Sequence, residues 1–397
     1  MNYLRKMAGA GVSAALLSAC GGSGFSSSTP MPVAAQLRAT GPAYKSLYSF
    51  KGPDGNEPQA GLIAVSGALY GTTTYGGAHG WGTVFKITTA GAESVIYAFK
   101  GKPDGGDPDG SLILVNGQLY GTTNEGGKAN DGSVFTVNPS TGKERVLFSF
   151  KGEDGLKPEG ALVAINGTLY GTTTEGGRYR YGTVFAVSAS GTERVLHSFK
   201  DYMDGGDGAV PEAGLTEVNG ALYGMTEYGG TGNSGSIFEV STSGTEKVIY
   251  SFEDGYDGAN PSDSLTDLDG TLYGTAEGGY AGSVFKVSTS GALSVLYDFK
   301  GAPDGALPEA GVLALNGTTY GTTIHGGSSS YYCLATAGCG TVFAISASGT
   351  ETVLYRFKGI RDGAFPVANL TALKGVLYGT TSAGGEKRIG TVFEVTP

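Results

Sequence analysis

Seven aspartates at a regular spacing are the residues of this chain best placed for chemistry, and the chemistry they suggest is metal binding. Each opens the phrase Asp-Gly-x-x-Pro, and no EF-hand spacing accompanies it. Calcium needs about six to eight oxygen ligands converging on one point. Because aspartate also caps its own turn, we favour a capping role and predict no metal ligand. The aspartates are Asp54, Asp104, Asp154, Asp207, Asp257, Asp304 and Asp362, and the nearby carboxylates, absent from the last unit, are Glu57, Asp107, Glu159, Glu212, Asp263 and Glu309.

Catalytic residues of other kinds are scarce. His79 and His325 lie in glycine-rich loops, and His197 stands in an apolar run where tyrosine is usual. The chain has no Gly-x-Ser-x-Gly elbow, His-Glu-x-x-His pair, phosphate loop or dinucleotide fingerprint. We therefore expect a protein that is not an enzyme and has no cofactor.

The first twenty residues differ from everything that follows. A short basic region and an apolar stretch end in Leu17-Ser18-Ala19-Cys20, which looks like a bacterial lipoprotein signal. That resemblance implies lipid attachment to Cys20 and cleavage before it, and the stretch is too short to span a membrane. We predict a signal peptide at 1–19, a lipidated flexible tether at 20–44, and export to the cell envelope, at the outer membrane if the cell is Gram-negative. The alternative is an ordinary secretory signal.

Two further cysteines, Cys333 and Cys339, lie in an insertion that begins at Ser328. Exported proteins reach a compartment in which disulfides form and persist. We therefore expect a disulfide that pins this loop, and the alternatives are free thiols or a metal.

One repeated unit must position all of these residues. The frame Tyr-Gly-Thr-Thr recurs seven times, at a period of about 50 residues. In the first unit we predict strands at 62–65, 68–73, 82–87 and 95–99, joined by hairpin-length links. Proline cannot donate to a sheet, so Asp-Gly-x-x-Pro is expected to form a crossover between units. This pattern predicts an all-β, seven-bladed β-propeller of four-stranded antiparallel blades, and a parallel β-helix is the alternative.

The third strand of each unit is apolar on both faces. Val84 and Phe85 point to opposite sides, as do their equivalents in the other units, so each sheet is expected to be buried between neighbouring blades. The repeats begin with a lone strand at 47–50 and end on a strand at 390–396. We predict that the N-terminal strand pairs with the C-terminal blade and closes the ring within a domain at 45–397.

The repeats diverge in the loops of one rim. In a meander, the crossovers and the loops between second and third strands emerge on the same face. Aromatic and basic side chains in these loops suit contacts with proteins or stacking against sugars, although solvated loops without a ligand are the alternative. The candidate binding face comprises His79, Trp81, Asn130, Arg178, Tyr179, Arg180, Tyr181, Tyr280, Tyr331, Tyr332, Lys387 and Arg388.

The unit Asn-Gly-x-Leu-Tyr-Gly-Thr-Thr, followed by Gly-Gly and then Gly-Thr-Val-Phe, resembles the GloVer tandem repeat of secreted and surface-anchored bacterial proteins. The resemblance covers about residues 46–397, with Met225 and Ala276 each replacing a threonine. It implies an architecture and a location, and it brings no established activity.

Charge narrows the choice of partner. The net charge of −10 and the pI of about 4.9 argue against nucleic acid and against anionic membrane surfaces. We interpret the chain as a monomeric cell-envelope propeller that touches the membrane only through its lipid and binds an envelope protein, as a scaffold, through its loop-bearing face. A carbohydrate-binding surface protein that recognises a surface glycan is the alternative. A polysaccharide- or peptide-acting enzyme is less favoured and would need two or more ionisable groups converging at the channel mouth.

Overall fold

The computed structural model describes residues 42–200, 206–253, 258–328, 332–333 and 338–397. Residues from Gly41 to Pro397 form one compact unit. The expected signal peptide, Cys20, most of the expected tether, Asp257 and Tyr331 lie outside the described residues. Within the described part of the chain, no helix is both long and apolar enough to cross a membrane.

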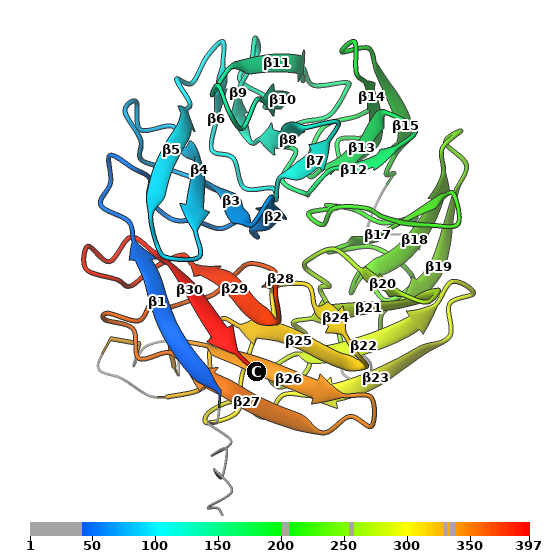
Figure 1. Cartoon of the computed structure of the whole chain (residues 1–397). Coiled ribbons are helices and arrows are strands. Elements are labelled where there is room, and N and C mark those ends of the chain that lie inside the picture. Colours follow the sequence, from blue (N-terminus) through cyan, green and yellow to red (C-terminus); the bar gives the residue numbers. More distant parts are fainter. Residues whose placement is uncertain (1–41, 201–205, 254–257, 329–331, 334–337) are drawn as a thin grey trace, which may run out of the picture. The chain divides into compact units, whose positions relative to one another are not determined.

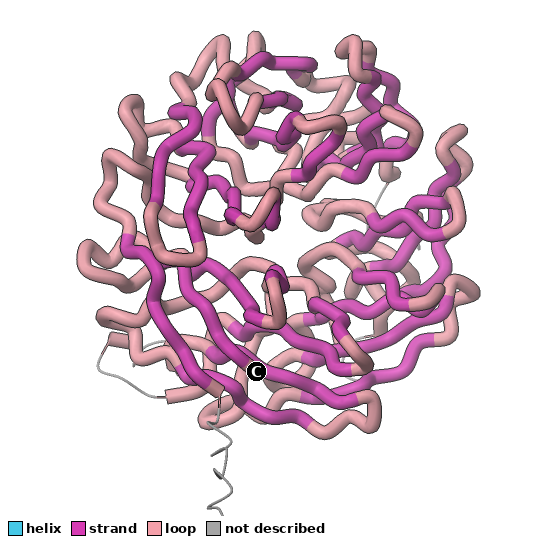
Figure 2. The backbone as a smooth tube through the Cα atoms, viewed as in Figure 1, coloured by secondary structure: helices cyan, strands magenta, loops and turns pink. Residues whose placement is uncertain are grey.

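Seven four-stranded antiparallel sheets stand in a ring, and loops join them at the rims (Figures 1 and 2). Blade 1 consists of β2 (Ile63–Val65), β3 (Ala68–Thr73), β4 (Thr83–Thr88) and β5 (Glu93–Ala98). Blade 2 consists of β7 (Ile113–Val115), β8 (Gln118–Thr123), β10 (Ser133–Val137) and β11 (Glu144–Ser149), and a short ladder pairs β6 (Gly105–Gly106) with β9 (Glu125–Gly126). Blade 3 consists of β12 (Val163–Ile165), β13 (Thr168–Thr173), β14 (Thr183–Ser188) and β15 (Glu193–Ser198).

The remaining blades repeat this plan. Blade 4 consists of β16 (Thr216–Val218), β17 (Ala221–Thr226), β18 (Ser236–Ser241) and β19 (Glu246–Ser251). Blade 5 consists of β20 (Thr266–Leu268), β21 (Thr271–Ala276), β22 (Ser283–Ser288) and β23 (Leu293–Asp298). Blade 6 consists of β24 (Leu313–Leu315), β25 (Thr318–Thr323), β26 (Thr341–Ser346) and β27 (Glu351–Arg356). Blade 7 consists of β28 (Thr371–Leu373), β29 (Val376–Thr381), β30 (Thr391–Thr396) and β1 (Ala43–Ser49).

The predicted seven-bladed propeller and its closure are confirmed. β1 runs antiparallel to β30, with Ala43 opposite Thr396 and Ser49 opposite Thr391. Figure 1 shows the blue N-terminal strand lying beside the red C-terminal strand of the same sheet. The closing strand begins at Ala43, two residues before the domain boundary that the repeat pattern suggested.

Three of the four positions of the Tyr-Gly-Thr-Thr frame have a structural reason, which unit 3 illustrates. A Cβ on Gly171 would lie 2.6 Å from the Phe185 ring, so only glycine fits beneath that phenylalanine. Thr172 donates to the carbonyl of Ala213 in the next blade, at 2.7 Å. Thr173 bonds Thr183 of its own blade at 2.9 Å. The frame therefore ties one strand to its own sheet and to its neighbour.

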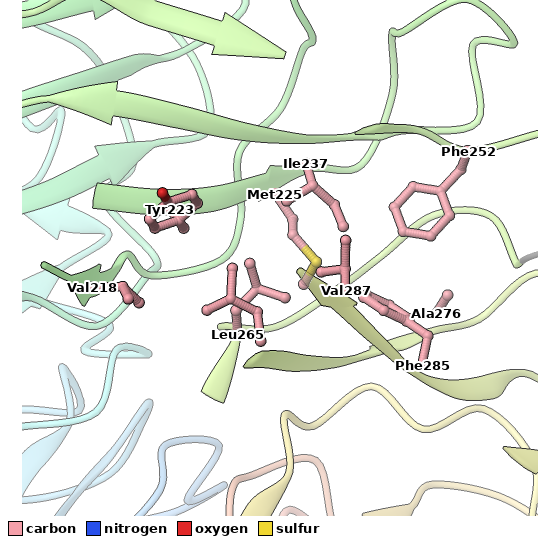
Figure 3. Close-up of a cluster of buried hydrophobic side chains, with 10 residues drawn as sticks. Val218, Tyr223, Met225, Ile237, Phe252, Leu265, Ala276, Phe285 and Val287 are labelled. Carbon is pink, nitrogen blue, oxygen red and sulfur yellow. The ribbon is translucent and has the colours of Figure 1, made fainter. Parts of the chain in front are cut away.

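Paired phenylalanines fill every interface between blades. The phenylalanine after a fourth strand packs edge-to-face against the third-strand phenylalanine of the next blade, as Phe252 does against Phe285 with ring centroids 5.4 Å apart. Figure 3 shows this pair in the core between blades 4 and 5, with Met225 and Ile237 close by. Such pairs contribute about 0.5–1.5 kcal/mol beyond their burial. The other pairs are Phe50–Phe85, Phe99–Phe135, Phe150–Phe185, Phe199–Phe238, Phe299–Phe343 and Phe357–Phe393.

The crossovers share one rim with the loops between second and third strands, as expected from the meander. Asn56 of the first crossover forms a bridge with Tyr75 of such a loop, and Leu156 does so with Glu175. This shared rim is called the loop-bearing face below.

Candidate functional site

A small acidic pocket marks the end of the central channel on the loop-bearing face. All seven repeat units contribute to its lining, which places it on the propeller axis, and its volume is about 210 Å³. None of the described residues that line it is a lysine or an arginine. We call this pocket the channel mouth. Its carboxylates are Asp109, Glu159, Glu212, Asp263, Glu277 and Glu309.

The crossover phrase explains how these carboxylates reach the axis. Four of them, Asp109, Glu159, Glu212 and Glu309, directly follow the proline of Asp-Gly-x-x-Pro, where the chain turns inward before the innermost strand of the blade. Small residues follow them because segments of all seven repeat units converge here. A Cβ on Gly160, for example, would lie 2.7 Å from a backbone nitrogen of blade 4. The acids therefore project where little else of any size fits.

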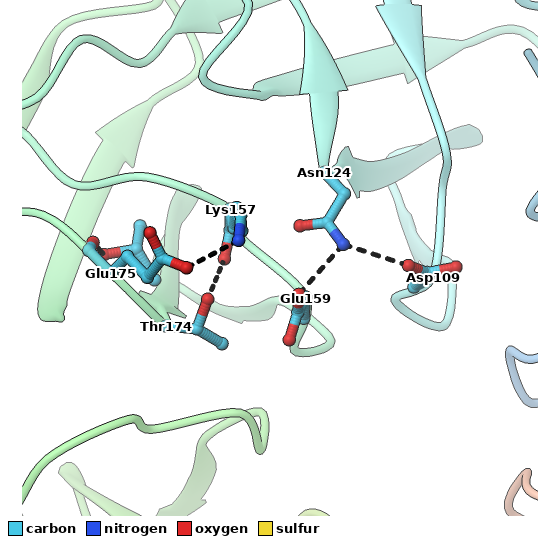
Figure 4. A network of polar contacts seen from close by, with 7 residues as sticks. Asp109, Asn124, Lys157, Glu159, Thr174 and Glu175 are labelled. Carbon is cyan, nitrogen blue, oxygen red and sulfur yellow. Dashed lines mark hydrogen bonds and ion pairs between the residues drawn. The ribbon is translucent and has the colours of Figure 1, made fainter.

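A bridging amide joins two of these acids (Figure 4). Asn124 Nδ2 donates to Asp109 Oδ2 at 3.1 Å and to Glu159 Oε1 at 2.9 Å. Thr74 Oγ1 donates to the other oxygen of Asp109 at 2.5 Å. Lys157, the nearest ammonium in this view, instead pairs with Glu175 at 2.5 Å on the side of the network away from Asp109. Lys157 therefore forms its ion pair outside the group of mouth carboxylates.

Backbone donors hold a further acid in place. Asp263 Oδ2 accepts from the amide of Gly311 at 3.0 Å, and Oδ1 accepts from the amide of Ser264. Blade 5 therefore contributes a carboxylate one residue later in the phrase than its neighbours do. The mouth is acidic although its acids do not all occupy one repeat position.

Burial and mutual repulsion raise the pKa of these groups. Burial, followed by the charges of Glu227 and Glu159, raises the pKa of Glu212 to about 8. Burial and the charge of Glu277 raise the pKa of Glu309 to about 7. Burial is also the main cause that raises the pKa of Asp109 to about 6. Near neutral pH the mouth therefore holds protonated and ionised carboxyls side by side, which can attract a cation or transfer a proton.

The aromatic residues expected on the binding face divide into packed and exposed side chains. Trp81 covers the next crossover so closely that a Cβ on Gly101 or Gly106 would lie under 3 Å from its ring. Tyr181 lies at the equivalent position and packs against the core of the next interface. Tyr332 is half-buried beneath the guanidinium of Arg388, at 4.7 Å. The Trp81 ring, which was expected to stack against sugars, thus packs against the next crossover.

The exposed members of the binding face come from separate blades. Tyr280 is 91 % exposed and Tyr179 is 38 % exposed, with the Arg178 guanidinium 5.4 Å from the Tyr179 ring. Arg178 and Arg180 line a surface hollow of about 920 Å³ together with Glu153 and Glu175.

Four other expected residues, Asn130, His79, Lys387 and Arg388, are also exposed at the rim. Asn130 Oδ1 accepts from the amide of Gly126 at 3.3 Å. Of the described residues expected on this face, the structure joins two from different blades, Tyr332 and Arg388.

A disulfide joins Cys333 to Cys339, with Cα atoms 5.3 Å apart. Both cysteines are buried, and the bridge lies against Gly359, where an added Cβ would be 2.7 Å from Cys339 Sγ. The bridge therefore belongs to the packing of this rim.

The turn aspartates lie at the outer edge of the interfaces. Asp54 Oδ1 accepts from the Lys51 amide at 2.7 Å, and Asp362 accepts from the Lys358 amide at 3.0 Å, which is the capping role expected of them. Tyrosines of the outermost strands also donate to them, as Tyr97 does to Asp104 at 2.7 Å.

The channel mouth was not predicted as a site. Glu159, Glu212, Asp263 and Glu309 were noted from the sequence only as neighbours of the turn aspartates. The available signal was their place after the crossover proline. Two exposed aromatics were also missed: Tyr75 and Tyr228 are 40 % and 38 % exposed at the ends of second strands.

Sequence comparison gives a family. The family described as the Gloeobacter/Verrucomicrobia repeat matches residues 26–238, 202–335 and 237–397. No curated protein matches the chain in sequence.

Comparison with solved structures returns propellers of several kinds. An oligogalacturonate lyase in complex with manganese has a TM-score of 0.55 at 10 % identity, over 89 % of this chain and 92 % of that one. The S511A mutant of a puromycin hydrolase, complexed with PGG, has a TM-score of 0.53 at 14 % identity, over 82 % of this chain and 50 % of that one. TolB from Acinetobacter baumannii has a TM-score of 0.41 at 13 % identity, over 68 % of this chain and 58 % of that one. At these identities the likeness to the lyase and to the hydrolase shows the fold alone.

Proposed function

Because the chain belongs to the Gloeobacter/Verrucomicrobia repeat family and its variable loops share a face with an acidic channel mouth, we propose that it is a protein-binding module of the cell envelope. The loop-bearing face would hold a partner that inserts a cationic group, such as a lysine or arginine side chain, into the channel mouth. The observation that carries this proposal is the gathering of six carboxylates at the axis with no lysine or arginine among the described lining residues.

Charge supports a cationic partner. Ionised carboxylates that are partly withdrawn from water attract a cation more strongly than the same groups would at an open surface. A basic side chain entering the mouth would also relieve the repulsion by Glu227 and Glu159 that, after burial, raises the pKa of Glu212 to about 8. The exposed Tyr179, Tyr280, Tyr75 and Tyr228 would supply apolar contact around that central charge.

Anchoring by lipid is a separate part of the proposal. It rests on Leu17-Ser18-Ala19-Cys20 and on no feature of the folded unit. Growth with a labelled fatty acid tests it: we expect label on the wild-type chain and none on Cys20→Ala. Equal labelling of the two chains would remove lipid attachment and leave the binding face unaffected.

Affinity capture from mildly solubilised envelopes tests the binding face. We would compare the full wild-type chain with Glu212→Gln/Glu309→Gln, which replaces two mouth carboxyls that an inserted cation would hold in the ionised form. The matched control is Asp269→Asn/Asp298→Asn, which removes two exposed carboxylates, one from an inner hairpin turn and one from an outer strand. A third variant, Arg178→Ala/Arg180→Asn, changes the rim alone, and asparagine suits position 180 because Asn130 and Asn233 take the same left-handed conformation.

We expect one protein to be captured in near-equal amounts by wild type and control and to be reduced at least tenfold by the mouth variant. Loss with the rim variant but not with the mouth variant would keep a binding face and reject the cationic insertion. Equal capture by all four chains would reject the proposal.

An enzyme acting on a polysaccharide is a second candidate, which the pKa of Glu212 favours. A carboxyl that stays protonated near pH 7 beside ionised carboxylates can act as a general acid on a glycosidic oxygen. Converging ionisable groups at the channel mouth are the feature that this interpretation required, and the structure has them. Release of reducing ends or unsaturated products from a glycan panel, abolished in Glu212→Gln and retained in Asp298→Asn, would support it. No product from any glycan in the panel would reject it.

A further inference from the structure

The interface between blades 3 and 4 differs from three equivalent interfaces at one position of the fourth strand. At three other interfaces a fourth-strand tyrosine meets the turn aspartate and a glutamate from the next blade: Tyr48–Asp54–Glu93, Tyr97–Asp104–Glu144 and Tyr297–Asp304–Glu351. Between blades 3 and 4 the tyrosine is replaced by His197, which meets Asp207 and Glu246. A hydroxyl is thus exchanged for an imidazole in an otherwise repeated cluster.

The three side chains lie close enough to share one ion. His197 Nε2 is 2.9 Å from Asp207 Oδ2, and a carboxylate oxygen of Glu246 completes a set whose members all lie within 4.8 Å of one another. Zinc bonds of about 2.0–2.2 Å in a tetrahedral site would hold such atoms about 3.3–3.6 Å apart. Small rotations of the side chains would therefore bring the three atoms to zinc-binding distances.

The surroundings orient these ligands. The amide of Lys200 donates to Asp207 Oδ1 at 2.9 Å, which leaves Oδ2 directed at the imidazole. The His197 ring packs edge-to-face on Phe199 at 4.9 Å between centroids. The side chains of His197 and Asp207 are each 12 % exposed, so the site is largely desolvated but reachable from water.

Glu246 has one carboxylate oxygen without a hydrogen-bond partner among the described residues. Among the described residues, none forms a hydrogen bond with Glu246 Oε1, although that atom is buried. The equivalent oxygens of Glu93, Glu144, Glu193 and Glu351 share this property. The imidazole is therefore what distinguishes this cluster, because it adds the nitrogen ligand that zinc and related ions prefer over an all-oxygen set.

We propose that His197, Asp207 and Glu246 form a binding site for a divalent transition-metal ion of the zinc class, which joins blades 3 and 4 at their outer edge. The ion would take the place of the proton between His197 and Asp207, and water would complete its coordination. His197 and Glu246 come from the outermost strands of adjacent blades, β15 and β19, so the bound ion would cross-link two blades.

Zinc binding by the full, metal-stripped chain tests this inference, with free zinc buffered by a chelator of known affinity. The matched control is His197→Tyr, which installs the residue that five of the other six interfaces carry and is therefore expected to fold. We expect wild type to bind one zinc per chain at this site, and both His197→Tyr and Glu246→Gln to bind it at least 100-fold more weakly. Zinc should also raise the melting temperature of wild type by several degrees and leave that of His197→Tyr unchanged.

Equal zinc affinity in wild type and His197→Tyr would overturn the proposal, and so would a wild-type chain with no saturable zinc binding. Calcium provides a second control, because an all-oxygen site would favour it. A thermal shift with calcium that matches the shift with zinc would overturn the role given to the imidazole. Conversely, Tyr97→His should create a second zinc site with Asp104 and Glu144. A folded Tyr97→His variant that binds no second zinc would contradict the role that the comparison of equivalent interfaces gives to the imidazole.

Discussion

Carboxyl groups are partly buried both at the outer edges of the blades and at the channel mouth, but these two regions hold them in different ways. At the outer edge the acids recur in register: Glu93, Glu144, Glu193 and Glu351 occupy one repeat position, and their pKa values are raised to about 7 by burial and a neighbouring aspartate. At the mouth the repeat position that holds Glu212 is filled by Gln59, Ser262 and Val367 in other units.

This difference indicates a structural role for the outer-edge carboxyls and a functional role for those of the mouth. An acid that occupies the same repeat position at one interface after another is part of how the blades pack together. An irregular acid at the axis destabilises the fold by its desolvation without being required by the repeat. The carboxyls of the mouth are therefore the better candidates for selection by a ligand, as their raised pKa values also suggest.

The largest expected effect contrasts an interface side chain with a mouth side chain. Phe135→Ala removes one member of the aromatic pair with Phe99 and should destabilise the fold by about 3–5 kcal/mol, because the ring is fully buried. Glu212→Gln should change stability by less than about 1 kcal/mol, or increase it. Urea unfolding followed by far-UV circular dichroism measures both. If Glu212→Gln lowers the free energy of unfolding by several kcal/mol, Glu212 has a structural role, and the proposed difference between the mouth and the interfaces is wrong.

A pH series tests the carboxyls of both regions together. Their folded-state pKa values lie above the unfolded values, at about 8 for Glu212 and about 7 for Glu144. Stability from these groups is therefore complete below about pH 4.5 and is lost as the pH rises through about 6–8. We expect the melting temperature to fall by several degrees between pH 5 and pH 8. The slope should be shallower in Glu212→Gln/Glu309→Gln, and a melting temperature that rises over this range would contradict the assignment.

A smaller effect probes the outer edge alone. Tyr97→Phe removes the hydroxyl that donates to Asp104 at 2.7 Å and should destabilise the fold by about 1 kcal/mol. Chemical denaturation provides the measurement, and capture of the partner should be unchanged because this residue is remote from the mouth. If Tyr97→Phe no longer captures the partner but keeps its stability, the binding site lies at the outer edge and not at the mouth.

The smallest effect runs in the opposite direction. Blade 2 carries Phe148 at a position where five of the other six blades have tyrosine, and Asp154 lies at the corresponding turn. Phe148→Tyr should supply the missing donor and stabilise the fold by up to about 1 kcal/mol. A change in the urea midpoint would show it, and a destabilised variant would mean that the cluster does not use the hydroxyl as its siblings do.

The fold could be predicted from the sequence because its local signals recur at fixed offsets. Glycine under a phenylalanine and a proline in the crossover recur in all seven units, and a threonine bonded to the next blade recurs in five of them, so one unit explains the others. Strand bounds were accurate to within about two residues for β3 and β4, and less so for β1, which begins at Ala43. The pairing of β1 with β30 followed from counting strand types in the first and last units.

The candidate site was harder to predict because its residues meet only after the ring closes. Asp109 and Glu277 are far apart in the sequence and occupy different repeat positions, yet both line the channel mouth. Trp81 has the residue type of a sugar platform, and only the structure shows its ring over the glycines of the next crossover. His197 was noticed as an exception to a tyrosine pattern, but its two partners come from a crossover and a neighbouring blade.

The pairing of β1 with β30 has a consequence for synthesis and transport. β1 is made first among the strands and its partner last, so the first strand waits unpaired while nearly the whole chain is produced. An unpaired strand edge is a template for pairing with another chain. During synthesis and any export of this chain, the interval in which β1 is exposed to such pairing therefore ends only when β30 has been made, and a chain without β30 leaves β1 and β29 each with an edge that β30 covers in the intact blade.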